Sequence, residues 1–417
     1  MIFSNKSILL LLAIFSVSFV WAENEVENSS LSDSVSVQKS AGRSFLKYGN
    51  KGFIFEDKSG NYLMRVEFRG QFRLSYPTDS DPVTYDDYDK EELYLAIRRA
   101  RIKVGGHSFK PWLNYYFEYE LFSSNLLDFR LMFEKYKWFK IKIGQWKVQY
   151  NRERIISSGK QQTAERSILT RVFTIDRQQG ISFYGNLDFG GMLNFNYWVS
   201  VFMGTGRGAK FNDDKHLMYM TRLQWNPNGR VLKFSSSDIE YHEKLTSLIA
   251  VAAVTNQSPY TRFSQSGGGE LEGFQPGVDG QYRINQCLEE TAFKYKGLSW
   301  QQEFHYKQIK DKINHSETEL LGNLAQIGYF FHGLWKPFPQ HLETYVRHAF
   351  YYPEVNRSSI VQSEITLGLN YFVSGHRFKI TTEASYLGIN EEGKLNPVYP
   401  GQEEEGWRFR AQLDISF

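Results

Sequence analysis

The sequence has almost no cysteine and, beyond its first residues, no long hydrophobic run. Cys287 is the only cysteine among 417 residues, so the chain can form no internal disulfide and has no thiol pair for a redox or metal centre. Charged residues interrupt every apolar stretch after residue 22, whereas a membrane-spanning helix needs about 20 apolar residues. The formal net charge of +3 is too small to indicate a nucleic-acid partner. These absences argue against a redox protein, a helical membrane protein and a nucleic-acid-binding protein.

The first 22 residues have the pattern of a secretory signal peptide. Lys6 is the only charge before an apolar run from Ile8 to Val20, and Val20-Trp21-Ala22 provides a cleavage site before Glu23. We therefore predict a signal peptide over 1–22 and export of the protein. Residues 23–60 are expected to form a periplasmic N-terminal segment, disordered over 23–40 because that stretch has no periodicity. The barrel domain described next is expected to occupy 61–417.

Aromatic residues are abundant, with 26 Tyr and 33 Phe, and they lie in segments that alternate between apolar and polar residues. In the first segment the even positions are Tyr62, Met64, Val66, Phe68, Gly70, Phe72, Leu74 and Tyr76, and the odd positions are Leu63, Arg65, Glu67, Arg69, Gln71, Arg73 and Ser75. A period of two predicts a strand with one apolar face, and the tyrosines at both ends match the aromatic girdles at lipid interfaces. The last segment, 405–417, alternates in the same way and ends on Phe417.

Sixteen such segments follow one another along the chain. They are 62–76, 93–106, 112–122, 126–136, 138–147, 177–187, 191–203, 216–226, 245–256, 288–297, 298–309, 320–332, 341–352, 361–373, 376–387 and 405–417. The alternation is poor in 245–256 and 320–332. Long connections such as 148–176 alternate with short ones, as in bacterial outer-membrane barrels, although 227–244 is long where a short turn is expected. The sequence thus predicts an all-β fold, a sixteen-stranded antiparallel transmembrane β-barrel in which the first and last segments pair.

The polar face of these strands is expected to line the lumen, and basic residues outnumber acidic ones on it. The pore-lining candidates are Arg65, Arg69, Arg73, Arg99, Arg101, Lys103, Lys140, Lys142, Arg408 and Arg410. Eight of them lie on the first, second and last strands, which are neighbours in a closed barrel, and we expect these residues to face only two acids, Glu67 and Asp414. A basic stripe of this kind concentrates anions, and guanidinium groups bind phosphate and carboxylate well. The alternative is that the charges keep the wall hydrated and pair with acids across strands.

Five short motifs in order resemble the phosphate-selective porin O and P family. They are Arg98-Arg99-Ala100-Arg101 followed by Gly105-Gly106, Ile143-Gly144-Gln145-Trp146-Lys147-Val148, Ser157-Ser158, Glu165-Arg166-Ser167 and Arg177-x-x-Gly180. This chain has Gln149-Tyr150 where the family often has proline. The resemblance implies a homotrimer of sixteen-stranded barrels in the outer membrane of a Gram-negative-type bacterium. It also implies an inward-folded third external loop and passive uptake of anions such as phosphate or polyphosphate.

The composition of 148–176, the third external loop, agrees with that placement. It contains aliphatic residues that need burial, namely Ile155, Ile156, Ile168, Leu169 and Val172, and more basic than acidic residues. The candidates for a pore constriction are Arg152, Arg154, Lys160, Glu165 and Arg166, with Glu165 expected to pair with an arginine. The alternative is a surface loop packed over the trimer axis.

Other functions remain open at this stage. A sugar-type or non-selective channel would use aromatic side chains in the lumen. The alternation of strand side chains predicts an inward position for Tyr116, Tyr136, Tyr184 and Trp198. A structural or adhesive barrel would use its loops to bind partners. An enzyme is disfavoured because no inward Ser and His pair lies on neighbouring strands. We expect no cofactor and no bound metal; the expected partners are small anionic solutes and outer-membrane lipid.

Overall fold

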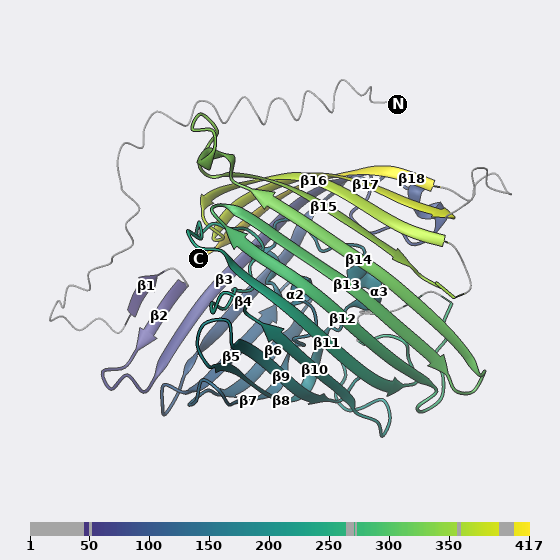
Figure 1. Ribbon diagram of the computed structural model, residues 1–417, viewed down its shortest axis with the longest axis horizontal. Coiled ribbons are helices and arrows are strands. Elements are labelled where there is room, and N and C mark those ends of the chain that lie inside the picture. The colour runs from purple at the N-terminus through teal and green to yellow at the C-terminus, as the bar shows by residue number, and fades with distance from the viewer. Residues whose placement is uncertain (1–45, 50–51, 264–270, 272, 357–359, 392–403) are drawn as a thin grey trace. The chain divides into compact units, whose positions relative to one another are not determined.

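The computed structural model describes residues 46–49, 52–263, 271, 273–356, 360–391 and 404–417. The predicted signal peptide and the stretch 23–40 lie outside them. Within them, eighteen strands form one antiparallel sheet, and the sixteen strands from β3 to β18 close into a barrel (Figure 1). Among these residues, no helix has both the length and the apolar character needed to cross a bilayer.

The sixteen strands β3 to β18 correspond one to one to the sixteen predicted segments, and β1 and β2 precede them. The strands are β1 Leu46–Gly49, β2 Gly52–Glu56, β3 Leu63–Tyr76, β4 Tyr94–His107, β5 Leu113–Glu120, β6 Asn125–Phe133, β7 Lys140–Lys147, β8 Arg177–Asp188, β9 Asn194–Phe202, β10 Met218–Trp225, β11 Thr246–Ser258, β12 Tyr282–Tyr295, β13 Leu298–Asp311, β14 Ser316–Tyr329, β15 Leu342–Tyr352, β16 Ile360–Ser374, β17 Phe378–Glu391 and β18 Glu404–Ser416. The helical turns are η1 Tyr85–Asp89, α2 Arg152–Ile155, η2 Ser158–Lys160, α3 Leu169–Phe173 and η3 Phe331–Gly333.

The barrel closes between its first and last strands, as predicted. β18 pairs with β3 from Phe409 opposite Tyr76 to Ser416 opposite Arg69. Phe68 and Phe417 then exchange two backbone hydrogen bonds, of 2.8 and 3.0 Å. Closure matters because an open strand edge in lipid would leave backbone groups without partners.

The remaining edge of β3 is covered by a hairpin that the sequence analysis did not anticipate. β1 and β2 pair with each other, and β2 pairs with Leu63–Val66 of β3. β18 ends before this part of β3, so the hairpin supplies the hydrogen-bond partners that the last strand cannot reach.

The two faces of the wall have the predicted polarity. On β3, Arg69 and Arg73 are only 5% and 1% exposed, whereas Phe72 and Leu74 are 45% and 39% exposed on the outer face. Polar side chains are therefore buried inside the barrel and apolar side chains face outward, as a lipid-exposed barrel requires.

The differences from prediction fall where the inner face is itself apolar. β12 begins at Tyr282 instead of 288, and β14 spans Ser316–Tyr329 instead of 320–332. The inward residues of β12 include Ile284, Leu288 and Ala292, all buried. Because apolar residues lie on the inward face, while the outer face of β12 carries polar residues such as Asn285 and Glu289, the expected alternation is weak in these sequences. Cys287 lies within β12, on the exposed outer side.

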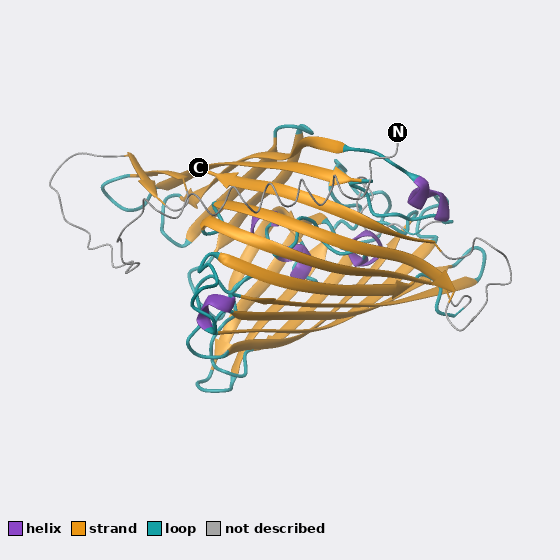
Figure 2. Ribbon diagram, turned by 90° about the horizontal axis from the view of Figure 1, so that it is seen from above, coloured by secondary structure: helices purple, strands orange, loops and turns teal. Residues whose placement is uncertain are grey.

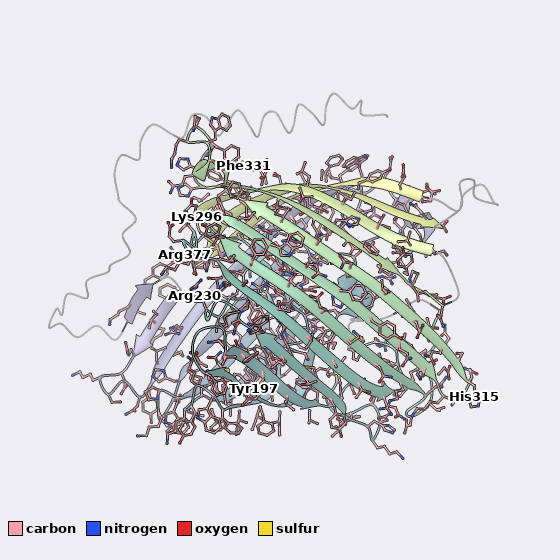
Figure 3. All side chains as sticks on the ribbon, in the orientation of Figure 1. Tyr197, Arg230, Lys296, His315, Phe331 and Arg377 are labelled. Carbon is pink, nitrogen blue, oxygen red and sulfur yellow. The ribbon has the colours of Figure 1, made fainter. Side chains whose placement is uncertain are left out.

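The connections alternate between the two ends of the barrel. Arg230, Lys296, Phe331 and Arg377, which belong to connections β10–β11, β12–β13, β14–β15 and β16–β17, lie at one end, and His315 of the β13–β14 turn lies at the other (Figure 3). The C-terminus is at the first of these ends (Figure 1). The long connections β3–β4, β7–β8 and β11–β12 start from the second end, which we call the long-loop end.

Candidate functional site

The connection from β7 to β8, residues 148–176, crosses the interior of the barrel. Its backbone N–H groups donate to carboxylates of distant strands: Arg152 to Glu290 on β12 at 3.0 Å, and Ala164 to Glu383 on β17 at 2.9 Å. Figure 2 shows helical turns surrounded by strands. These contacts tie the segment to wall strands far from the two that it connects.

Side chains of the wall also hold the carbonyl groups of this segment. Lys379 donates to the oxygen of Gln161 at 2.6 Å, Lys307 to that of Val172 at 2.8 Å and Arg222 to that of Tyr150 at 2.7 Å. Non-helical backbone inside a barrel needs such partners, because its polar groups are buried. Several lumen charges therefore support the segment instead of facing solute.

Apolar packing provides the second attachment of the segment. Ile168, Leu169, Val172 and Phe173 are buried in the largest hydrophobic cluster of the protein. The wall contributes Ile284, Leu288, Ile309, Leu320 and Leu324 to the same cluster. The aliphatic residues of 148–176 are thus buried, as their composition predicted, except that Ile155 is half-buried.

An arginine network joins this segment to the first, second and last barrel strands. We define it by its members: Arg73, Arg98, Arg99, Arg166 and Arg410, with the carboxylates Asp79, Glu165 and Glu383. Glu165 lies 2.7 Å from Arg99, 3.2 Å from Arg73 and 3.3 Å from Arg98, measured between nitrogen and oxygen. Five arginines share three carboxylates, so the network carries two net positive charges.

A β-bulge brings Arg98 into the network. In the pairing of β3 with β4, Gln71 lies opposite Arg99 but Phe72 lies opposite Ile97, so Arg98 is an extra residue. A bulge places two consecutive side chains on one side of the strand, and both Arg98 and Arg99 reach Glu165. Sequence parity missed Arg98. The signal that could have found it is the adjacent pair Arg98-Arg99, because strict alternation would place one of these two charges in lipid.

Two carboxyl groups of the network belong to loops. Burial by itself raises the pKa of Glu165, but Arg99, Arg73 and Arg98 lower it further and hold it well below its ordinary value. Burial likewise raises the pKa of Asp79, and Arg73 and Arg410 more than reverse this, so that its pKa is lowered. Both groups are therefore ionised at neutral pH, and they neutralise part of the arginine charge.

The expectation that the basic stripe meets only Glu67 and Asp414 is wrong. Arg69 does pair with Asp414 at 2.7 Å and Lys103 with Glu67 at 2.5 Å. The stripe also meets Asp79, Asp81 and Glu165, which come from the long loops, and Glu118, Glu120 and Glu383, which come from neighbouring strands. The physical reason is that a buried guanidinium group needs a counter-charge, and the loops supply it.

The remaining pore-lining candidates lie apart from the network. Arg101 binds Glu118 at 2.8 Å and Glu120 at 2.6 Å, Lys140 binds Glu134 at 3.4 Å, and Arg408 binds Asp81 at 2.8 Å. Lys142 is buried with its ammonium group 4.8 Å from the ring centre of Tyr184. Arg65 is half-buried on β3.

The constriction candidates are not equivalent. Arg152 donates to the carbonyl groups of Lys233 and Ser235, Arg166 donates to those of Glu153 and Ile156, and Arg154 pairs with Asp176. Lys160 is exposed within η2. Arg152 and Arg166 therefore act mainly on backbone groups, and Glu165 pairs with wall arginines, as expected.

A second segment, 226–245, enters the barrel from the other end. Ser236 donates its backbone N–H to Lys160 at 2.9 Å, and Ser237 donates its hydroxyl to Glu343 of β15 at 2.7 Å. Lys294 of β12 donates to Ser235 at 2.8 Å and to the carbonyl of Ser237 at 2.6 Å. The unusually long connection 227–244 is therefore a structured part of the lumen and contains no additional strand pair.

The aromatic candidates do not form a continuous row. Tyr116 and Tyr184 donate their hydroxyl groups to Glu118 and Glu134, and Trp198 lies 5.8 Å from the Arg222 guanidinium. Tyr136 belongs to the turn between β6 and β7 and is 49% exposed, so its predicted inward position is wrong. Within the part of the chain that the structure describes, no three His, Cys, Asp or Glu side chains are arranged to hold a metal ion.

Comparison with known proteins identifies the family. Solved structures with the same fold include an anion-selective porin from Comamonas acidovorans, at 12% identity with a TM-score of 0.52 and covering 85% of this chain and all of that one. Another is the outer-membrane channel DcaP of Acinetobacter baumannii, at 11% identity with a TM-score of 0.51 and covering 87% of this chain and 99% of that one. A third is OmpT of Vibrio cholerae in its trimer form, at 12% identity with a TM-score of 0.51. That match covers 85% of this chain and 99% of the OmpT chain.

At the level of sequence, no curated protein matches the chain. The profile of the family described as phosphate-selective porin O and P matches residues 66–415, which is nearly the whole barrel. The chain therefore belongs to the phosphate-selective porin O and P family and is an outer-membrane porin.

Proposed function

We propose that the protein is a passive, anion-preferring channel for small oxyanions, with phosphate or polyphosphate as candidate solutes. The observation that carries this proposal is the net positive charge of the arginine network, in which five arginines share three carboxylates. The description of the family and the anion-selective porin of similar fold support it. Passage through such a channel involves no catalysis and no cofactor.

The mechanism is electrostatic. A surplus of positive charge inside a wall of low dielectric attracts anions and raises the local potential against cations. Guanidinium groups suit phosphate because their parallel N–H donors match two oxygens at once. Because every arginine of the network already has a carboxylate partner, an incoming anion exchanges with an existing contact. Such exchange keeps binding weak enough for release, which conduction requires.

The test is the reversal potential of the purified protein in planar bilayers under a potassium chloride gradient. We expect chloride to permeate better than potassium, and the variant Arg98→Gln/Arg99→Gln to lose much of that preference. Arg65→Gln is the matched control, because Arg65 lies on β3 outside the network. Equal reversal potentials for the double variant and the unmodified protein would reject the proposal.

We also propose that the protein assembles as a homotrimer. The trimer form of OmpT, which has the same fold, supports this assembly. The mass of the detergent-solubilised protein, measured by light scattering with the detergent subtracted, distinguishes one barrel from three.

A further inference from the structure

The loop between β3 and β4, residues 77–93, places a carboxylate among the lumen arginines. The Oδ1 atom of Asp79 lies 3.0 Å from Arg73 Nη1 and 3.4 Å from Arg410 Nε, and its Oδ2 atom lies 3.5 Å from Arg98 Nε. Ser75 donates its hydroxyl to the same carboxylate at 2.7 Å. Three guanidinium groups and a hydroxyl group thus surround one small anion, and that anion is part of the chain.

The neighbouring residues of the loop continue this contact along β18. Arg410 donates to the carbonyl oxygen of Asp79 at 2.5 Å, and Arg408 donates to the carbonyl of Ser80 at 3.1 Å and to the carboxylate of Asp81 at 2.8 Å. Val83 accepts a hydrogen bond from Gln362 of β16 at 3.3 Å. Residues 79–83 of the loop therefore lie against Arg408 and Arg410, and we call these residues the strap.

The donors at this place exceed the acceptors that the strap provides. The Nε atoms of Arg98 and Arg410 lie 3.5 and 3.4 Å from the Asp79 carboxylate, yet both are buried and neither has a hydrogen-bond partner among the described residues. Buried N–H groups without partners are costly, and a carboxylate offers only two oxygens. A tetrahedral oxyanion offers four, so it can satisfy donors that Asp79 leaves unused.

We propose that Asp79 is an internal ligand of an oxyanion site formed by Arg73, Arg98, Arg410 and Ser75, and that a permeating oxyanion such as phosphate binds there by displacing it. This inference rests on the proposed function and adds a site and a competitor to it. The site lies toward the long-loop end, because β3 ends at Tyr76 and the strap begins beside it. Asp79 sets how tightly the channel holds its solute near that entrance.

The test compares two aspartates of the same loop. Asp79→Asn keeps the shape and removes the competing charge, so inorganic phosphate should block chloride current at a concentration lower by about tenfold or more. Asp81→Asn makes the same change of charge at the carboxylate that pairs with Arg408, outside the site, and should shift the block much less. Equal shifts in the two variants would mean that the loop acts through its field alone and would overturn the proposal.

A neutral substitution separates binding in the place of Asp79 from a change in potential. In the Asp79→Asn background, Ser75→Ala removes a hydroxyl donor and no charge. If phosphate occupies the site, this second change weakens the block by several-fold, whereas a field effect leaves it as it was and contradicts the inference. Titration calorimetry of the detergent-solubilised variants with inorganic phosphate gives the same comparison without current, and Asp79→Ala replaces Asp79→Asn if the latter does not fold.

The outcome for the proposed function is read separately. The reversal potential of the unmodified protein decides whether the channel prefers anions. If it does and Asp79→Asn leaves phosphate block unchanged, the internal ligand is rejected while the channel function stands. If the protein prefers cations, the proposed function fails whatever the variants of the loop do.

Discussion

Outside the arginine network, several lumen charges of this porin are neutralised in buried pairs. The side chains of Arg222 and Glu290 are both 0% exposed and form two hydrogen bonds of 2.9 Å. Glu290 also accepts the backbone N–H of Arg152. This carboxylate therefore joins β10, β12 and the inner segment 148–176.

Removing that carboxylate should be strongly destabilising. Glu290→Gln leaves the Arg222 guanidinium without its counter-charge, which typically costs about 3–5 kcal/mol in a buried pair. We expect a lower midpoint for the unfolding of the detergent-solubilised protein in denaturant, followed by tryptophan fluorescence. Glu317→Gln is the control, since its partner Lys310 and Glu317 are 46% and 40% exposed and the loss should be small. An unchanged midpoint for Glu290→Gln would show that the pair does not anchor the segment.

The sequence predicts which residues face the lumen but not which residues they bind. Parity placed Arg73 and Arg99 inside, and they are inside. Their common partner, Glu165, is 66 residues or more away along the chain, and only the path of the inner segment brings it there. Arg98 was missed because a bulge changes parity locally. Pairing of this kind depends on tertiary placement, which a local pattern does not contain.

At the scale of whole elements, the period of two is informative wherever one face meets lipid and the other meets polar groups. It is weak in β11 and it shifts the predicted bounds of β12 and β14, because apolar residues such as Leu248, Leu288 and Leu320 face inward against the buried loops. The inner segment 226–245 was not predicted for a different reason, and only its unusual length pointed to it. Its residues carry no periodic pattern, since it is held by individual hydrogen bonds and not by pairing.

The inner segment 226–245 should restrict conduction at the end of the barrel where it enters. It reaches from β10 to Glu343 on β15 and contacts Lys160 of the other inner segment. Replacing residues 229–243 with two glycines should therefore increase single-channel conductance in planar bilayers. The control is a similar shortening of 331–338, a connection at the same end whose Leu334 and Trp335 are 78% and 61% exposed. If both deletions change conductance equally, or neither does, the segment does not narrow the path.

At the scale of the whole molecule, the wall of the barrel is not uniform in height. β5, β7 and β10 have 8 residues and β6 and β9 have 9, whereas β11 has 13, β12, β13, β14 and β17 have 14, and β16 has 15. A tilted strand needs about 9–11 residues to cross the hydrocarbon layer. The short strands are consecutive except for β8, so one side of the barrel is low and the other is high (Figure 1).

We expect the low side to face partner subunits in the proposed trimer and the high side to face lipid. The outer face of the low side is apolar, with Phe129 and Leu131 of β6 57% and 45% exposed, and apolar surface suits a permanent interface. The single cysteine makes this testable, because a Cys287→Ser background carries no thiol. In that background, Leu131→Cys should be protected from a membrane-soluble maleimide, whereas Leu367→Cys on β16, where Leu367 is 60% exposed, should react fully. Dissociation of the trimer should make Cys at position 131 reactive, and equal reactivity at both positions in the intact assembly would place the interface elsewhere.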